Sequence, residues 1–238
     1  MNTEILKSGG MVILSMLLVT LLGCQGGMVG NGHVISRNKE VKDFTRLVIT
    51  GNFNVYLVPS TPSTLRMEMD ENLFDNVKVI EQGSTLRIDT RLNVLQAHEK
   101  NLYIGVHDLD KIELSGAIKM VADSVLHSEA LNIQVSGAAK LDLGIESRKL
   151  RIDLSGASEC ELRGKSDDFR IQISGAGSIN AFELIAKTVK VELSGAGNAR
   201  VNAKDDLDVN ISGVGSVRYR GEPEIHKNIS GLGTLKRD

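Results

Sequence analysis

The sequence predicts an all-β protein, a parallel β-solenoid (β-helix) of about seven coils that follows a less regular N-terminal β region. The first observation is a Ser-Gly dipeptide that occurs seven times between residues 115 and 231, at intervals of 18 to 21 residues. Such a constant period is typical of repeat architectures, in which each unit packs on its neighbours. The dipeptides are Ser115-Gly116, Ser136-Gly137, Ser155-Gly156, Ser174-Gly175, Ser194-Gly195, Ser212-Gly213 and Ser230-Gly231.

The second observation is a two-residue alternation around each dipeptide. The positions two and four before each glycine are aliphatic, except for Lys227 in the last unit, and the position between them is polar. This alternation is typical of a strand with one buried face, so each unit is predicted to be strand, bend, strand and turn. The polar positions hold Glu113, Gln134, Asp153, Gln172, Glu192, Asn210 and Asn228, and the position four after each glycine holds Met120, Leu141, Cys160, Ile179, Ala199, Val217 and Leu235.

Glycine is predicted at each corner of the coil because it accepts positive φ without a Cβ clash. The serine hydroxyls before these glycines either hydrogen-bond from coil to coil or bond locally to the bend. The predicted structural bends are Gly51, Gly116, Gly137, Gly156, Gly175, Gly195, Gly213 and Gly231.

Residues 1–23 are predicted to be a lipoprotein signal peptide. The apolar run from Met11 to Leu22 has the length of a signal-peptide core and is too short to span a bilayer comfortably. It ends in Leu21-Leu22-Gly23-Cys24, which resembles the lipobox of bacterial lipoproteins and implies a lipid anchor on Cys24. A plain secretory signal with an incidental cysteine is the alternative. Residues 24–39 are rich in glycine and polar side chains, and are predicted to be a flexible tether.

Residues 40–110 are predicted to form an N-terminal β region, and residues 111–238 the Ser-Gly solenoid. The first region contains strands on both sides of Gly51 and a hairpin around Gly83. Residues 70–76 are predicted to be a loop or one helical turn. Irregular units of this kind are typical of the capping region of a solenoid.

The lipobox, the pattern Phe44-x-x-Leu-Val-Ile-Thr-Gly-x-Phe-x-Val and the serial Ser-Gly-Ala units resemble the head GIN domain family of auto-transporter adhesins. The resemblance extends from about Asp43 to Leu235. It implies a right-handed β-helix-like fold in the bacterial cell envelope, and it carries no catalytic residues to this chain. Gln25 follows the lipobox cysteine in place of the aspartate that resembles an inner-membrane retention signal, so the outer membrane is the expected location if the source is Gram-negative.

No catalytic, cofactor or metal site is predicted. His33, His98, His107, His127 and His226 lack metal-ligand spacing and are expected to be solvated loop residues. Cys160 falls in an apolar column, where a small buried hydrophobe is expected rather than a nucleophile. The carboxylates of Glu113, Asp153 and Glu192 alternate with amides, which keeps like charges apart in neighbouring coils. A carbohydrate-cleaving β-helix would instead use such carboxylates for catalysis.

We therefore expect a membrane-tethered β-solenoid with a structural, scaffolding or adhesin-like role, and no enzyme. The alternative is a carbohydrate-binding or carbohydrate-cleaving β-helix, which would need a groove lined with aromatic rings, and aromatic residues make up only 3% of the chain. The net charge of −2 does not predict a nucleic-acid partner. The expected partners are the membrane, through the lipid, and an envelope protein or glycan.

The C-terminal coil is expected to keep the protein monomeric. Lys227, Lys236 and Arg237 place positive charge near its edge, which discourages strand pairing between molecules. The alternative is that this edge pairs with a second copy or a partner strand.

Overall fold

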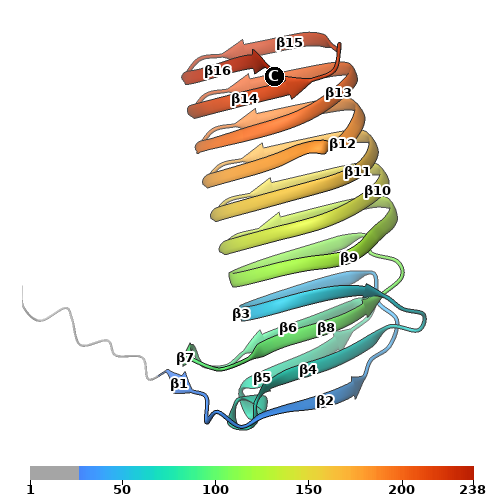
Figure 1. Cartoon of the computed structure of the whole chain (residues 1–238), viewed down its shortest axis with the longest axis vertical. Coiled ribbons are helices and arrows are strands. Elements are labelled where there is room, and N and C mark those ends of the chain that lie inside the picture. The colour runs from blue at the N-terminus through green and yellow to red at the C-terminus, as the bar shows by residue number, and fades with distance from the viewer. Residues whose placement is uncertain (1–26) are drawn as a thin grey trace, which may run out of the picture.

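The computed structural model describes residues 27–238 and is a stack of β coils standing on a smaller β region (Figure 1). Strands make up 77% of the structure and helix 3%, and the coils form a β-solenoid of about six turns. The sequence predicted about seven coils, which is close to this number. In residues 27–238, no helix is long and apolar enough to cross a membrane.

Parallel strands form the solenoid, as the alternation predicted. β3 (Arg46–Pro59) pairs with β9, each of β10 to β13 pairs with the strand before it, and β16 pairs with β14. The last full-length strand, β13, pairs with both β14 and β15, which share one coil. The strands are β9 (Lys111–Val135), β10 (Ala138–Leu154), β11 (Ala157–Ile173), β12 (Ala176–Leu193), β13 (Ala196–Ile211), β14 (Val214–Arg220), β15 (Glu224–Ile229) and β16 (Leu232–Arg237).

The register confirms the predicted inward column. Leu141 lies opposite Met120 on one side and Cys160 on the other, and Cys160 lies opposite Ile179. All four side chains are buried, and Phe169 is the largest of the fully buried side chains. Like columns therefore stack to form one continuous apolar core, which holds each coil on its neighbours.

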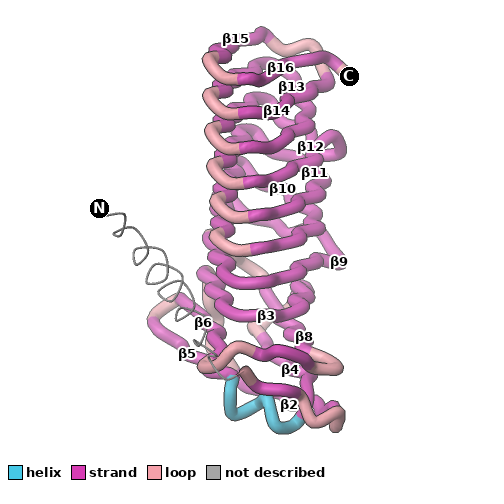
Figure 2. Tube along the Cα trace, turned by 90° about the vertical axis from the view of Figure 1, so that its left-hand side faces the viewer, coloured by secondary structure: helices cyan, strands magenta, loops and turns pink. Residues whose placement is uncertain are grey.

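The corner glycines are required for a different reason from the predicted one. Of the eight, only Gly51 (φ 135°) and Gly116 (φ 108°) adopt positive φ, so that explanation is wrong for the other six. A Cβ placed on Gly175 would meet the backbone oxygens of Gly156 and Ser155 at distances that real Cβ atoms do not show. The corners stack in one column along the solenoid (Figure 2), and this close approach of backbones excludes a side chain.

The serine before each glycine bonds from coil to coil. The Val135 carbonyl accepts both the backbone N–H of Ser155 (2.9 Å) and its hydroxyl (3.1 Å). Ser136 and Ser174 donate their hydroxyls to the carbonyls of Leu114 and Leu154 in the same way. For the hydroxyls of these three serines, the structure selects the bond to the preceding coil over the local bond.

The N-terminal region continues the sheet with antiparallel strands. β4 (Thr64–Asp70) pairs with β8 (Lys100–Val106) and with β2 (Val34–Glu40). β5 (Val77–Gln82) and β6 (Thr85–Thr90) form the predicted hairpin around Gly83, and β6 joins β3 in parallel. The 3-10 helix η1 (Glu71–Asn76) is the predicted helical turn. Two short strands, β1 (Met28–Val29) and β7 (Val94–Gln96), pair separately.

The prediction of a flexible tether over residues 24–39 is wrong for its second half. β2 forms an antiparallel ladder with β4 in which Val34 lies opposite Asp70 and Glu40 opposite Thr64. Its side chains are mostly exposed, so the segment lacks the alternation that identifies a strand. Pairing of backbone groups with β4, not burial of side chains, orders this segment.

Asp70 anchors this N-terminal segment. Its carboxylate is fully buried and accepts the backbone N–H groups of Gly32, His98 and Glu99. Burial alone would raise the pKa of the Asp70 carboxyl, but these hydrogen bonds outweigh it and hold the pKa below its usual value. One side chain thus joins the turn before β2 to the turn before β8.

Candidate functional site

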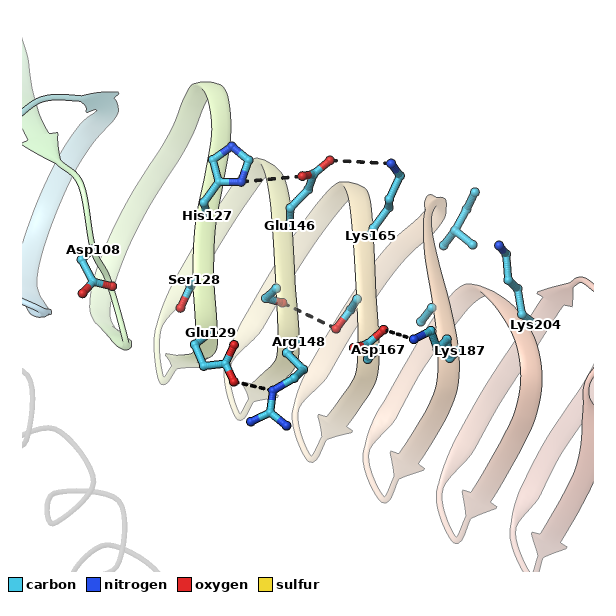
Figure 3. Close-up of a pocket in the computed structure, with 14 residues that line it drawn as sticks. Asp108, His127, Ser128, Glu129, Glu146, Arg148, Lys165, Asp167, Lys187 and Lys204 are labelled. Carbon is cyan, nitrogen blue, oxygen red and sulfur yellow. Dashed lines mark hydrogen bonds and ion pairs between the residues drawn. The ribbon is translucent and has the colours of Figure 1, made fainter.

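A charged groove of about 730 Å³ crosses neighbouring coils of the solenoid (Figure 3), and its residues lie about midway along the chain between successive Ser-Gly dipeptides. We call it the corner groove, and none of the Ser-Gly corner glycines lines it. Because the coils are in register, residues at one position of the repeat form rows across the groove. Its lining residues are Asp108, His127, Ser128, Glu129, Glu146, Ser147, Arg148, Lys165, Ser166, Asp167, Ile185, Ala186, Lys187 and Lys204.

Charges alternate in sign along the first row. Glu146 lies between His127 (Nδ1 to Oε2, 3.6 Å) and Lys165 (Nζ to Oε1, 3.9 Å). Figure 3 shows these three side chains reaching across adjacent coils. Opposite charges on directly neighbouring strands stabilise the stack by fractions of a kilocalorie per pair.

A second row repeats this arrangement. Arg148 pairs with Glu129, and Lys187 Nζ lies 2.7 Å from Asp167. Lys187 donates a hydrogen bond to Asp167, and this bond together with the negative charge of Asp167 raises the pKa of Lys187. Lys204 makes no ion pair with any residue of the described range 27–238, so it leaves a positive charge available at the end of the groove.

Serines occupy the middle of the corner groove, but no base activates them. Ser128 donates to the Leu109 carbonyl (2.7 Å) and Ser166 to the Asp168 carbonyl (3.1 Å). Ser147 lies 3.5 Å from Ser166. Among the described residues, no histidine bonds to a groove serine, and a serine nucleophile needs such a base. The groove therefore suits polar contact rather than covalent chemistry.

The face that carries the predicted carboxylate column holds a second groove, of about 520 Å³. The predicted alternation is confirmed, since Asp153 lies opposite Gln134 and Gln172. Arg151 Nε also binds Asp153 at 2.9 and 3.0 Å. This hydrogen bond and the charge of Asp153 raise the pKa of Arg151.

Sequence reasoning missed a base two residues before each of these acids. Lys111 lies 2.8 Å from Glu113, and Lys190 lies 2.9 Å from Glu192. The signal was present, because a basic residue at i and an acid at i+2 point to the same face of a strand. Each acid is thus paired with a basic side chain two residues earlier on the same strand. Glycosidic cleavage needs two carboxylates that flank the scissile bond, whereas in this column amides separate each acid from the next.

Among the described residues, Cys160 and the histidines do not form a pair of nucleophile and general base. Cys160 is a free, buried thiol, and burial raises its pKa to about 12, so the reactive thiolate does not form near neutral pH. His127 and His226 lie on strands, not in loops as expected. All five histidines lie within 4.0 Å of a carboxylate: His33 by Glu71, His98 by Asp70, His107 by Asp43, His127 by Glu146 and His226 by Glu224.

Aromatic rings do not form a sugar platform in the described residues. Tyr103 stacks on Tyr56 with ring centroids 4.9 Å apart, and Arg66 covers the ring of Tyr103 at 3.8 Å. Phe182 is likewise covered, by Arg220. Ring faces occupied in this way are closed to sugar stacking, and neither of the two grooves described above is lined by Phe, Tyr or Trp. The predicted lipidation residue, Cys24, lies outside the described residues.

Known structures share this architecture. A structure described as a "putative adhesin" from Bacteroides fragilis NCTC 9343 has a TM-score of 0.85 and 25% sequence identity, and the match covers 89% of this chain and 100% of that one. A second "putative adhesin", from Parabacteroides distasonis ATCC 8503, has a TM-score of 0.69 at 23% identity, covering 90% and 100%. A "putative lipid binding protein" from the same strain has a TM-score of 0.69 at 22% identity, with the same coverage. The search of curated proteins gave no match.

The family comparison agrees with the architecture. The model described as "Putative auto-transporter adhesin, head GIN domain" matches residues 43–223, which include the N-terminal β region and most of the solenoid. The fold and this match support an adhesin-like structural role, and neither the family nor these neighbours carry an enzyme's description. The chain belongs to the head GIN domain family of auto-transporter adhesins.

Proposed function

We propose that this chain is an adhesin-like, non-enzymatic β-solenoid of the bacterial cell envelope, anchored through a lipid on Cys24. The observation that carries the adhesive role is the corner groove, which crosses several coils and gathers charges without an activated nucleophile. A rigid stack of coils presents such a surface in a fixed shape, as extended repeat proteins do when they bind partners. The partner we propose is an anionic envelope protein or glycan, because Lys204 leaves positive charge available in the groove.

Attachment tests this role. Cells that carry the triple variant Lys165→Glu, Lys187→Glu and Lys204→Glu should attach to a surface coated with an anionic glycan less than cells with the wild type. Attachment by the wild type should also weaken as salt rises above about 0.15 M, where the screening length is about 8 Å. Lys119→Glu, on an exposed position of β9 outside the groove, is the control. Equal attachment by the triple variant and wild type at equal surface amounts would overturn the role of the groove.

The lipid anchor gives a separate prediction. Because Leu21-Leu22-Gly23-Cys24 resembles a lipobox, Cys24→Ser should release the protein into the soluble fraction with its circular dichroism spectrum unchanged. Metabolic labelling with a fatty acid should mark the wild type and not the variant. Cys160→Ser serves as the control, since that thiol is buried and should leave labelling intact. A soluble, unlabelled wild type would contradict the anchor.

The absence of enzymatic activity is part of the proposal. The carboxylate column is neutralised strand by strand, so we expect the purified protein not to turn over acidic polysaccharide. Turnover that Asp153→Asn abolishes would show that the carbohydrate-cleaving alternative is correct.

A further inference from the structure

One cluster near the C-terminal end departs from the charge pattern of the solenoid. On the strands before it, an acid is matched by a base two residues earlier, as in Arg151 and Asp153. On β13 and β15 the positions of these bases hold Asp208 and His226 instead. At Asp208 the exposed face therefore carries a negative charge at a position where the coils directly before it carry a basic side chain.

The register brings further acids onto this face. Asp206 lies directly opposite Glu224, and Asp208 lies directly opposite His226. Like charges directly opposite each other on neighbouring strands are destabilising unless a cation offsets them. The nearest base, Lys190, bonds Glu192 at 2.9 Å and lies 3.9 Å from Asp208. Within residues 27–238, Asp206 has no basic partner.

The side chains of Asp206, Glu224 and His226 converge. One donor atom from each, two carboxylate oxygens and one imidazole nitrogen, lies within 4.8 Å of the others. His226 Nε2 is 3.5 Å from Glu224 Oε1. Bonds from Zn²⁺ to such donors are about 2.0–2.2 Å long, so the donors must draw in by roughly 1 Å. All three side chains are exposed and free to make that movement.

We propose that Asp206, Glu224 and His226 form a binding site for a borderline divalent metal ion of the Zn²⁺, Co²⁺ or Ni²⁺ class. The imidazole selects this class, because Ca²⁺ and Mg²⁺ prefer oxygen donors alone. Two ligands lie on β15 and one on β13, so the ion joins consecutive coils. It offsets the repulsion between Asp206 and Glu224 and stabilises the coil that contains β15, whose residues are all exposed.

The site was invisible to spacing rules because its ligands are contributed by different coils. Glu224 and His226 are two residues apart, whereas Asp206 precedes Glu224 by a full repeat. Parallel stacking alone brings these residues together. The inference is independent of the proposed adhesive function, since it concerns other residues.

The test is equilibrium dialysis of the purified full-length chain against Zn²⁺. All proteins carry Cys24→Ser and no polyhistidine tag, so neither the Cys24 thiol nor a tag binds metal. We expect one saturable Zn²⁺ per chain, and a melting temperature that rises with Zn²⁺ because a ligand bound to the folded state stabilises it. His226→Ala and Glu224→Gln should each weaken binding by at least about tenfold and remove the thermal shift.

His127→Ala is the matched control. His127 also lies on an exposed strand beside a carboxylate, Glu146, but Lys165 lies on the other side of that carboxylate. This variant should bind Zn²⁺ as the parent does. The visible absorption of bound Co²⁺ should appear in the parent and in His127→Ala only. No saturable binding by the parent, or equal binding by parent, His226→Ala and Glu224→Gln, would overturn the site.

Discussion

Replacing Gly175 by valine should lower the free energy of unfolding by about 4 kcal/mol, and the melting temperature by about 10 °C. A Cβ at this position meets the backbone of the preceding coil at Gly156 and Ser155, and a backbone cannot swing away as a flexible side chain can. The coils must therefore separate locally, which breaks ladder hydrogen bonds on both sides. Thermal unfolding followed by circular dichroism measures the effect.

Two controls isolate the stacking clash. Ser178→Val, on an exposed position of β12, should change stability by less than about 0.5 kcal/mol. Gly144→Ala also replaces a glycine of the solenoid but creates no clash. The nearest atoms to a Cβ on Gly144 would lie at 3.5 Å, which is an ordinary contact distance. Gly175→Ala should therefore cost more than Gly144→Ala. Equal losses for these two alanine variants would contradict the explanation by close backbone approach.

Asp70→Asn should lower the free energy of unfolding by about 3 kcal/mol, because each buried donor left unsatisfied costs about 1–3 kcal/mol. The amide nitrogen of asparagine cannot accept the backbone N–H groups that one carboxylate oxygen accepts from His98 and Glu99. Hydrogen exchange should accelerate in residues 30–33 and 96–99, where the anchoring is lost. Denaturant unfolding together with exchange measured by mass spectrometry provides both values.

The pH dependence follows from the lowered pKa of Asp70. A carboxyl with a folded-state pKa below its usual 3.8 contributes stability above that value, and this stability is lost as pH falls through the folded-state pKa. In the Asp70→Asn variant, this part of the loss of stability at low pH should be absent. Glu71→Gln makes the same charge change at a half-exposed neighbour that pairs with His33, and should alter stability by less than about 0.5 kcal/mol. A similar loss in both variants would contradict the anchoring role.

The sequence alone determined the strands and the columns of the solenoid. A period-two alternation repeated at a nearly constant interval leaves one way to stack the units, with like residues aligned and the apolar set inward. Leu141 therefore lies between Met120 and Cys160 as predicted. The same pattern predicted the separation of acids by amides around Asp153.

Only the tertiary structure decided which groups approach each other across coils and across distant strands. Glycine is needed at position 175 because backbone carbonyls of the preceding coil leave no room for a Cβ. The conformational preferences of single residues do not predict such a contact between coils. β2 is ordered by backbone pairing with β4, some 30 residues later in the chain, so its exposed side chains carried no strand signal. The convergence of Asp206 with Glu224 and His226 likewise depends on the register between coils, because a contact between separate strands is a property of how the backbone stacks and not of spacing along the chain.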